Sequence, residues 1–158
     1  MNKTVLAIDP GANSGLAVVS QGPPIKLVAY HHYRFNNRKY SRCPSEVVRG
    51  IVEQFRPSFA IIEDQFHRRN LNTLKVLARN SGRWQEACES AGLKVEWVNP
   101  RTWQSAIFRG AGRTREQLEM AYTSLARSET RVSDLPVDVA AAYCLGRYGA
   151  IAFRSACQ

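Results

Sequence analysis

Residues 4–19 read TVLAIDPGANSGLAVV, and this stretch decides the fold. An unbroken apolar run leads to Asp9, which is typical of a strand buried on both faces of a sheet. Pro10 and Gly11 then supply the turn chemistry for a tight reversal into a second apolar strand. Asp9 is therefore expected at the carboxyl end of the first strand, where an acid either starts the turn or does chemistry.

A later stretch of the same build also ends on acid. Residues 59–64 read FAIIED, and residues 44–56 before them show a helical pattern, with Pro in the first turn and apolar residues at 3.6 spacing. A helical connection allows the strand ending at Glu63 to lie parallel to the first strand, roughly 5 Å away. Asp9 and Glu63 are then expected side by side at one edge of the sheet.

The other segments complete an α/β pattern. Residues 25–30 predict a third strand after the first hairpin, residues 93–98 predict a fifth, and the last helix is expected to begin near residues 134–136. We therefore expect a five-stranded mixed sheet, a three-strand antiparallel meander plus two parallel strands, flanked by helices. At this length a single domain covering residues 1–158 is the simplest interpretation.

The charge balance favours a polyanionic partner. Lys and Arg number 22 against 13 Asp and Glu, which gives a formal net charge of +9 and a pI near 9.8. Most of the cations are arginines, and arginine binds phosphate through two parallel hydrogen bonds and stacks on flat groups. Nucleic acid is the partner that this composition suits best, and a basic but inert surface is the alternative interpretation.

The cysteines and the hydropathy of the sequence predict the cellular compartment of the protein. Cys43, Cys88, Cys144 and Cys157 form no CxxC pair and have no histidine at metal-ligand spacing. We expect free thiols in a reducing environment. The sequence shows no pattern of a signal peptide, and none of its apolar runs approaches the roughly 18 residues needed to span a bilayer. We therefore expect a cytoplasmic protein that does not enter membranes.

Acids from distant parts of the chain suggest a metal site. Asp138 lies in the last helix beside small residues that allow close approach to the sheet, and Asp134 lies four residues earlier. Asp134 is either a helix cap or a further acid. Asp9, Glu63 and Asp138 would form an oxygen-rich cluster in a basic protein, which suits Mg²⁺. Two ions about 4 Å apart hydrolyse phosphodiesters, so the sequence predicts that reaction.

The order of these pieces resembles the RuvC family of Holliday junction resolvases, which are RNase H-like nucleases. The resemblance covers nearly the whole chain. It is carried by the segments AIDPGANSG, AIIEDQF with the basic loop and long helix through LARNSGR, NPRTW, GAGRTREQL and LPVDVAAAYCLG. It implies a Mg²⁺-dependent endonuclease that cuts four-way DNA junctions, acts as a homodimer and accepts Mn²⁺ in place of Mg²⁺, with one or two ions in each active site.

The resemblance also assigns roles to individual residues. Asp9, Glu63 and Asp138 correspond to metal ligands. Phe66 looks like the aromatic residue that stacks on bases at the junction centre, and Arg115 looks like the basic residue near the scissile phosphate, where the family usually has Lys. The basic segments of the motifs add three further DNA-binding candidates: Arg68, Arg69 and Arg113.

One departure from the family concerns the last helix. The family carries two acids three residues apart, and if Asp138 is the first, the second position is occupied by Ala141. Asp134 could replace the missing acid, since steps of three and four both keep side chains on one helix face. Alternatively, the site has three carboxylates, or the protein binds without cutting. Our hypothesis is an active enzyme with Asp134 as a fourth acid or as a residue supporting the ligands.

Other functions are compatible with parts of this sequence. The turn IDPGANSG also resembles the phosphate loop of sugar-kinase and actin-type ATPases, but that fold needs two related domains. The remaining alternatives are a module that binds branched DNA without cleaving it and a nuclease that acts on another DNA or RNA structure.

The histidines are not expected to be catalytic. His31 and His32 are expected to be surface or packing residues at the end of the third strand, and His67 is not ranked as catalytic.

Overall fold

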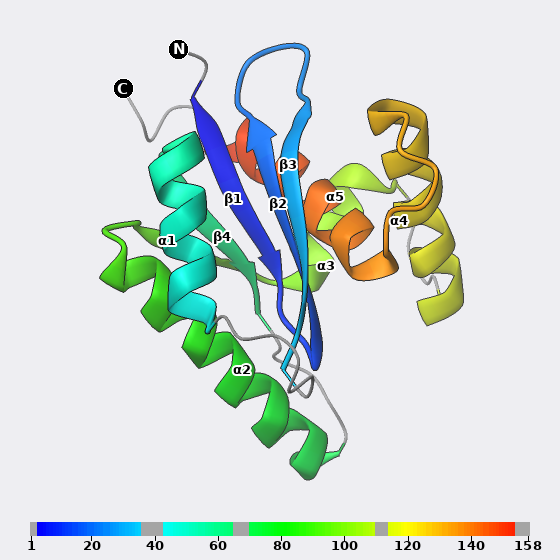
Figure 1. The fold of residues 1–158 in the computed structure, drawn as a ribbon. Helices are drawn as coiled ribbons and strands as arrows, with labels where there is room; N and C mark the ends of the chain where they lie inside the picture. Colours follow the sequence, from blue (N-terminus) through cyan, green and yellow to red (C-terminus); the bar gives the residue numbers. More distant parts are fainter. Residues whose placement is uncertain (1–2, 36–42, 65–69, 110–113, 154–158) are drawn as a thin grey trace.

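Five strands form one mixed sheet, with helices on both of its faces (Figure 1). The computed structural model describes residues 3–35, 43–64, 70–109 and 114–153. The strands are β1 (Thr4–Asp9), β2 (Asn13–Ser20), β3 (Leu27–Arg34), β4 (Phe59–Glu63) and β5 (Val95–Val98). The helices are α1 (Pro44–Phe55), α2 (Leu71–Ser90), α3 (Pro100–Ile107), α4 (Arg115–Thr130) and α5 (Val137–Ala152).

The strand order is β3-β2-β1-β4-β5, with β1 in the centre. β1 pairs antiparallel with β2, and β2 pairs antiparallel with β3. β1 pairs parallel with β4, and β4 pairs parallel with β5. The predicted sheet, a three-strand antiparallel meander plus two parallel strands, is therefore confirmed.

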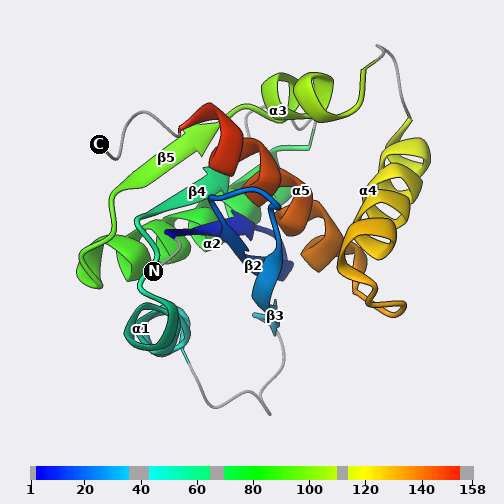
Figure 2. The ribbon, with the colours of Figure 1, turned by 90° about the horizontal axis from the view of Figure 1, so that it is seen from above.

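Strand alternation divides the apolar side chains of β1 between two cores. Val5 and Ala7 face the core that contains α5, whereas Leu6 and Ile8 face the core that contains residues of α1 and α2. All four are fully buried, which explains why β1 is apolar at every position. Figure 2 shows α1 and α5 on opposite sides of the sheet, and α4 packs against α5 rather than against the strands.

Small residues bring α5 close to the sheet. A Cβ atom at Gly146 would lie 2.7 Å from Cγ2 of Val19, and one at Gly15 would overlap the backbone carbonyl of Asp138. Any side chain at Gly15 would push the first turn of α5 away from β2. The approach of this helix is thus set by glycines on both contact surfaces.

Several elements differ in their bounds from the sequence prediction. The fifth strand, predicted at residues 93–98, covers Val95–Val98. The third strand covers Leu27–Arg34 instead of residues 25–30, because pairing with β2 continues to Asn13 opposite Arg34. The last helix begins at Val137 instead of near residues 134–136, because Pro136 is its N-cap and a residue before proline disfavours helical backbone. In the described ranges, none of the helices combines the length and apolarity needed to span a bilayer.

Candidate active site

Asp9 and Glu63 are the last residues of two neighbouring parallel strands. Ile8 is paired with Ile62 in the register of β1 and β4, so the next residue of each strand lies at the same level. Because side chains alternate along a strand, Asp9 and Glu63 both lie on the face covered by α5. The predicted juxtaposition of these two acids is therefore found.

Asp138 approaches the same place from the other direction. It lies in the first turn of α5, and its backbone rests on Gly15 of β2, the residue paired with Asp9. The absence of a side chain at Gly15 leaves the space that this helical turn fills. The acid from α5 is thereby placed above the row of strand residues that contains Asp9.

The turn after Asp9 is anchored by α2. The indole Nε1 of Trp84 donates to Ser14 Oγ at 3.0 Å, and Asn80 Nδ2 donates to the carbonyl of Gly11 at 3.0 Å. Ser14 and Trp84 are fully buried. A buried hydrogen bond of this kind is costly to break, so the turn that follows Asp9 has a fixed position.

One cavity of about 630 Å³ collects the acids. Asp9, Glu63 and Asp138 line it together. The other polar or charged residues of its wall are Asn13, Asp64, Thr73, Asn99, Arg101, Gln104, Arg115, Glu119 and Tyr122. The three predicted carboxylates converge as expected, and their roles as metal ligands stay predictions.

The donor chemistry of this cavity fits Mg²⁺. In the part of the chain that the structure describes, no three His, Cys, Asp or Glu side chains are close enough to form a ready-made metal site. Mg²⁺ does not need one, because it keeps several waters and is held by one or two carboxylates together with phosphates of a substrate. Carboxylate oxygens in one open cavity meet that requirement.

Ring nitrogens contact two of the three carboxylates. Trp103, which is fully buried in α3, donates from Nε1 to Glu63 Oε2 at 2.8 Å. His32 Nε2 on β3 lies 3.2 Å from Asp138 Oδ2. The sequence analysis expected His32 to be a surface or packing residue and did not predict this contact, which joins residues 106 positions apart in the chain.

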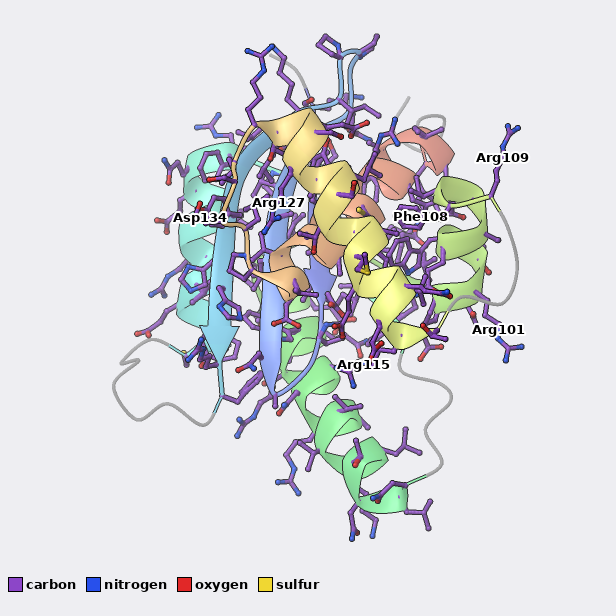
Figure 3. All side chains as sticks on the ribbon, turned by 90° about the vertical axis from the view of Figure 1, so that its right-hand side faces the viewer. Arg101, Phe108, Arg109, Arg115, Arg127 and Asp134 are labelled. Carbon is purple, nitrogen blue, oxygen red and sulfur yellow. The ribbon has the colours of Figure 1, made fainter. Side chains whose placement is uncertain are left out.

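Arg115 lies at the beginning of α4 (Figure 3), and it lines the cavity together with the three acids. Its Nε is 2.8 Å from Glu119 Oε1, one helical turn later. This hydrogen bond and the charge of Glu119 raise the pKa of the Arg115 guanidinium, and the charges of Asp138 and Asp9 add to the effect. Sequence reasoning found Arg115 but missed Glu119, although the spacing of four residues was the available signal.

Tyr122 forms a buried part of the cavity wall. Burial raises the pKa of its hydroxyl, and the nearby charges of Glu63 and Asp9 raise it further. Gln104 Nε2 donates to the Tyr122 hydroxyl oxygen at 2.8 Å. The phenol is therefore neutral under ordinary conditions and does not add to the negative charge of the cavity.

Comparison of the sequence with models of protein families identifies the family of this chain. The model described as "Crossover junction endodeoxyribonuclease RuvC" matches residues 5–146 of the 158. The chain belongs to the RuvC family. The resemblance predicted from the motifs is thus confirmed, and the family's nuclease activity is the activity expected of its members.

Solved structures agree with this RuvC-family fold. Thermus thermophilus RuvC has a TM-score of 0.76 at 19% identity, covering 98% of this chain and 97% of that chain. The fowlpox virus resolvase in complex with Holliday junction DNA has a TM-score of 0.59 at 17% identity, covering 95% and 98%. The yeast mitochondrial Holliday junction resolvase Ydc2 has a TM-score of 0.59 at 14% identity, covering 94% and 78%. Comparison with curated protein sequences gives no match.

Asp134 is not brought to the RuvC-family site. The prediction that it shares one side of the first helical turn with Asp138 is wrong, because it lies on an exposed turn before α5. It does not line the cavity, and Figure 3 shows it well apart from Arg115. Ala141 does line the cavity, so the position where the family's second acid was expected faces the site without a carboxylate.

The other DNA-binding candidates are Phe66, Arg68, Arg69 and Arg113, which lie outside the described residues. Their assigned roles stay predictions. Arg101, which the sequence analysis did not single out, lines the cavity from α3 and projects outward in Figure 3. It adds a second arginine to the rim formed by Arg115.

Proposed function

We propose that this RuvC-family chain resolves four-way DNA junctions by metal-dependent cleavage of phosphodiester bonds. The observation that carries the proposal is the convergence of Asp9, Glu63 and Asp138 on one cavity with Arg101 and Arg115 in its wall. An acidic cavity with an arginine rim, in a protein of net charge +9, attracts a DNA backbone and holds a cation against it.

We infer that Asp9, Glu63 and Asp138 bind one or two Mg²⁺ ions, with Mn²⁺ as a substitute. When bound, the cation supplies an activated water and stabilises the oxygen that leaves the phosphorus. Trp103 holds the carboxylate of Glu63 from the buried side. The neutral phenol of Tyr122 keeps the wall next to these acids free of a further charge.

Arg115 has the position to bind the phosphate being cut. Its side chain is 81% exposed, and exposed ion pairs contribute only about 0–1 kcal/mol. Arg115 therefore exchanges Glu119 for a phosphate at little cost. The positive charge of Arg115 also reduces the repulsion between the phosphate and the carboxylates of Asp9 and Asp138. Both carboxylates raise the pKa of Arg115.

The test is incubation of the protein with an end-labelled four-way junction in Mg²⁺, Mn²⁺ or EDTA. We expect paired nicks at symmetric positions with either metal and none in EDTA. Asp9→Asn is expected to bind the junction without cutting it, whereas the matched control Glu53→Gln, an exposed acid on α1, cuts like wild type. Junction binding by wild type without any nick would favour the non-cleaving module instead.

The same assay decides the role of Asp134. Asp134→Asn is expected to cut at the wild-type rate, because the side chain does not line the cavity. A large loss of cleavage in a folded Asp134→Asn protein would restore Asp134 as a member of the site.

We also propose that the active form is a cytoplasmic homodimer, because a junction has two strands to cut at related positions. The amino-terminal part of α2 extends beyond the sheet (Figure 1), and it exposes 71% of Leu71 and 47% of Val76. Apolar residues on a protruding helix suit a two-fold contact. Sedimentation is expected to give twice the chain mass of 17.8 kDa, and Val76→Glu is expected to shift the protein toward monomer.

A further inference from the structure

His32 belongs to a row of residues that crosses three strands toward the acids. Asp9 of β1 is paired with Gly15 of β2, and Gly15 is paired with His32 of β3. Neighbouring strands are about 4.8 Å apart, so His32 lies about 10 Å from Asp9 within the sheet. Asp138 rests above Gly15, between the two.

The row has a histidine at one end, an acid at the other and no side chain in the middle. Residues directly opposite each other on neighbouring strands point to the same face of the sheet, so His32 and Asp9 both point toward α5. The first turn of α5 occupies the space over Gly15. Asp138 is consequently within reach of His32 on one side and of the cavity on the other.

The contact between His32 and Asp138 engages one carboxylate oxygen. Nε2 lies 3.2 Å from Oδ2, and the two side chains are 22% and 35% exposed. An aspartate in the first turn of a helix otherwise has several side-chain rotamers of similar energy. A hydrogen bond to one oxygen selects among these rotamers and fixes the direction of the other oxygen.

We propose that His32 is a positioning residue for the metal site: its Nε2–H donates to Oδ2 of Asp138 and leaves Oδ1 available to a cation that would bind in the cavity. Hydrogen bonds of this kind, one shell away from a metal, orient the ligand and set its affinity for the ion. The inference rests on the proposed function, since it assumes that Asp138 is a ligand.

Two other roles for His32 are weaker. Direct ligation by His32 suits Mg²⁺ poorly, because this ion prefers oxygen ligands and Nε2 of His32 already contacts Oδ2 of Asp138. A role in general stability is limited by exposure, because a partly exposed pair contributes only about 0–1 kcal/mol. Orientation of Asp138 is the effect that remains.

The experiment measures Mn²⁺ affinity of the DNA-free protein by calorimetry, alongside single-turnover cleavage of the junction. His32→Ala is expected to weaken Mn²⁺ binding about tenfold. His32→Gln keeps an N–H donor of comparable reach and is expected to recover most of the affinity. His31→Ala is the matched control, because the neighbouring residue of a strand points to the opposite face. It is expected to bind Mn²⁺ like wild type.

Metal-free binding of the junction separates positioning from DNA contact. In EDTA, His32→Ala is expected to bind the junction with wild-type affinity, because loss of the imidazole affects only the binding of the cation, which EDTA removes. Cleavage by His32→Ala is expected to recover at high Mn²⁺ concentration, which a misfolded protein would not do. The half-saturating Mn²⁺ concentration therefore rises while the plateau rate changes little.

The outcomes separate this inference from the function on which it rests. If wild type cuts and binds Mn²⁺ but a folded His32→Ala protein binds it equally well, only the positioning role fails. If His32→Ala does not fold, His32→Phe takes its place, because it keeps a ring without a donor. A tenfold loss of affinity in the folded protein supports the role, and wild-type affinity overturns it. If wild type neither cuts the junction with Mn²⁺ nor binds the ion, the proposed function and the inference fail together.

Discussion

At the scale of single residues, the acids are held by neighbours that carry no catalytic charge themselves. Glu63 is reached by the indole of Trp103, and Asp138 by the imidazole of His32. Each contact engages one oxygen of a carboxylate that also lines the cavity. The geometry of the site therefore depends on side chains that a search for acids alone does not select.

Replacing Trp103 with Phe tests the contact to Glu63. The substitution keeps an aromatic ring in the core but removes the donor, and a hydrogen bond to a charged group contributes about 1.5–3 kcal/mol. We expect single-turnover cleavage to fall about 10- to 100-fold. Trp97→Phe is the control, because Trp97 is 39% exposed on β5. Equal rates for both variants would show that Glu63 needs no support from Trp103.

Replacing Glu119 with Gln tests the competition for Arg115. Loss of the carboxylate releases the guanidinium from its ion pair and removes a negative charge from the cavity. We expect junction binding at low salt to tighten by up to about fivefold, in line with an exposed pair of about 1 kcal/mol.

The opposite change, Arg115→Ala, is expected to weaken binding. It should also lower the slope of log affinity against log salt by about 1, as for one lost phosphate contact. Unchanged binding in both variants would remove Arg115 from the interface.

At the scale of elements, the site is assembled where β1, β4 and α5 meet. The glycine at position 15 decides how close the helix comes, because any Cβ there overlaps the carbonyl of Asp138. The first turn of α5 cannot shift without moving Asp138 relative to Asp9. The packing of α5 on the sheet therefore also fixes where Asp138 lies relative to Asp9.

Gly15→Ala is expected to lower stability by about 1–3 kcal/mol and to abolish cleavage, because overpacking displaces the helix. Urea unfolding and the junction assay measure the two effects. Gly82→Ala is the control, since a Cβ atom at Gly82 on α2 would meet no atom of the described residues within 4 Å apart from its chain neighbours and the backbone of its own helix. There the same change is expected to raise stability by up to about 1 kcal/mol. Wild-type cleavage by Gly15→Ala would contradict the fixed approach of α5.

The sequence predicts the elements better than their contacts. The places of Asp9 and Glu63 are predictable because each ends an apolar strand, which is a local pattern. The contact of His32 with Asp138 is not predictable in the same way, since residues 30–34 read YHHYR and gain their strand conformation from pairing with β2. The contact of Trp103 with Glu63 likewise joins segments 40 residues apart.

At the scale of the whole molecule, two cores on either side of the sheet contain ionisable groups that are neutral when folded. Burial raises the pKa of Cys88 to about 12 and that of Cys144 to about 12, from ordinary values of 9.0. Burial also raises the pKa of Tyr122 and of Tyr143. These groups keep their protons in the native state at a pH where the unfolded chain loses them.

Stability is therefore expected to fall in alkaline solution. Below pH 9 both states bind the thiol protons, and the full stability is present. As pH rises from 9 toward 12 the unfolded chain binds fewer protons, so each buried thiol lowers the free energy of unfolding by up to about 1.4 kcal/mol per pH unit. Urea titrations at pH 8, 9 and 10 measure the slope, and Cys88→Ala is expected to make it shallower. A flat profile would contradict the burial of these thiols.

The position of α5 at the end of the element order has a consequence for synthesis on the ribosome. The strands that carry Asp9 and Glu63 emerge before α5, the helix that carries Asp138 and covers one face of the sheet. A growing chain without α5 therefore lacks Asp138, and under the proposed function we expect that it does not cut the nucleic acids around it. Ribosome-arrested chains lacking α5 are expected to be inert in the junction assay.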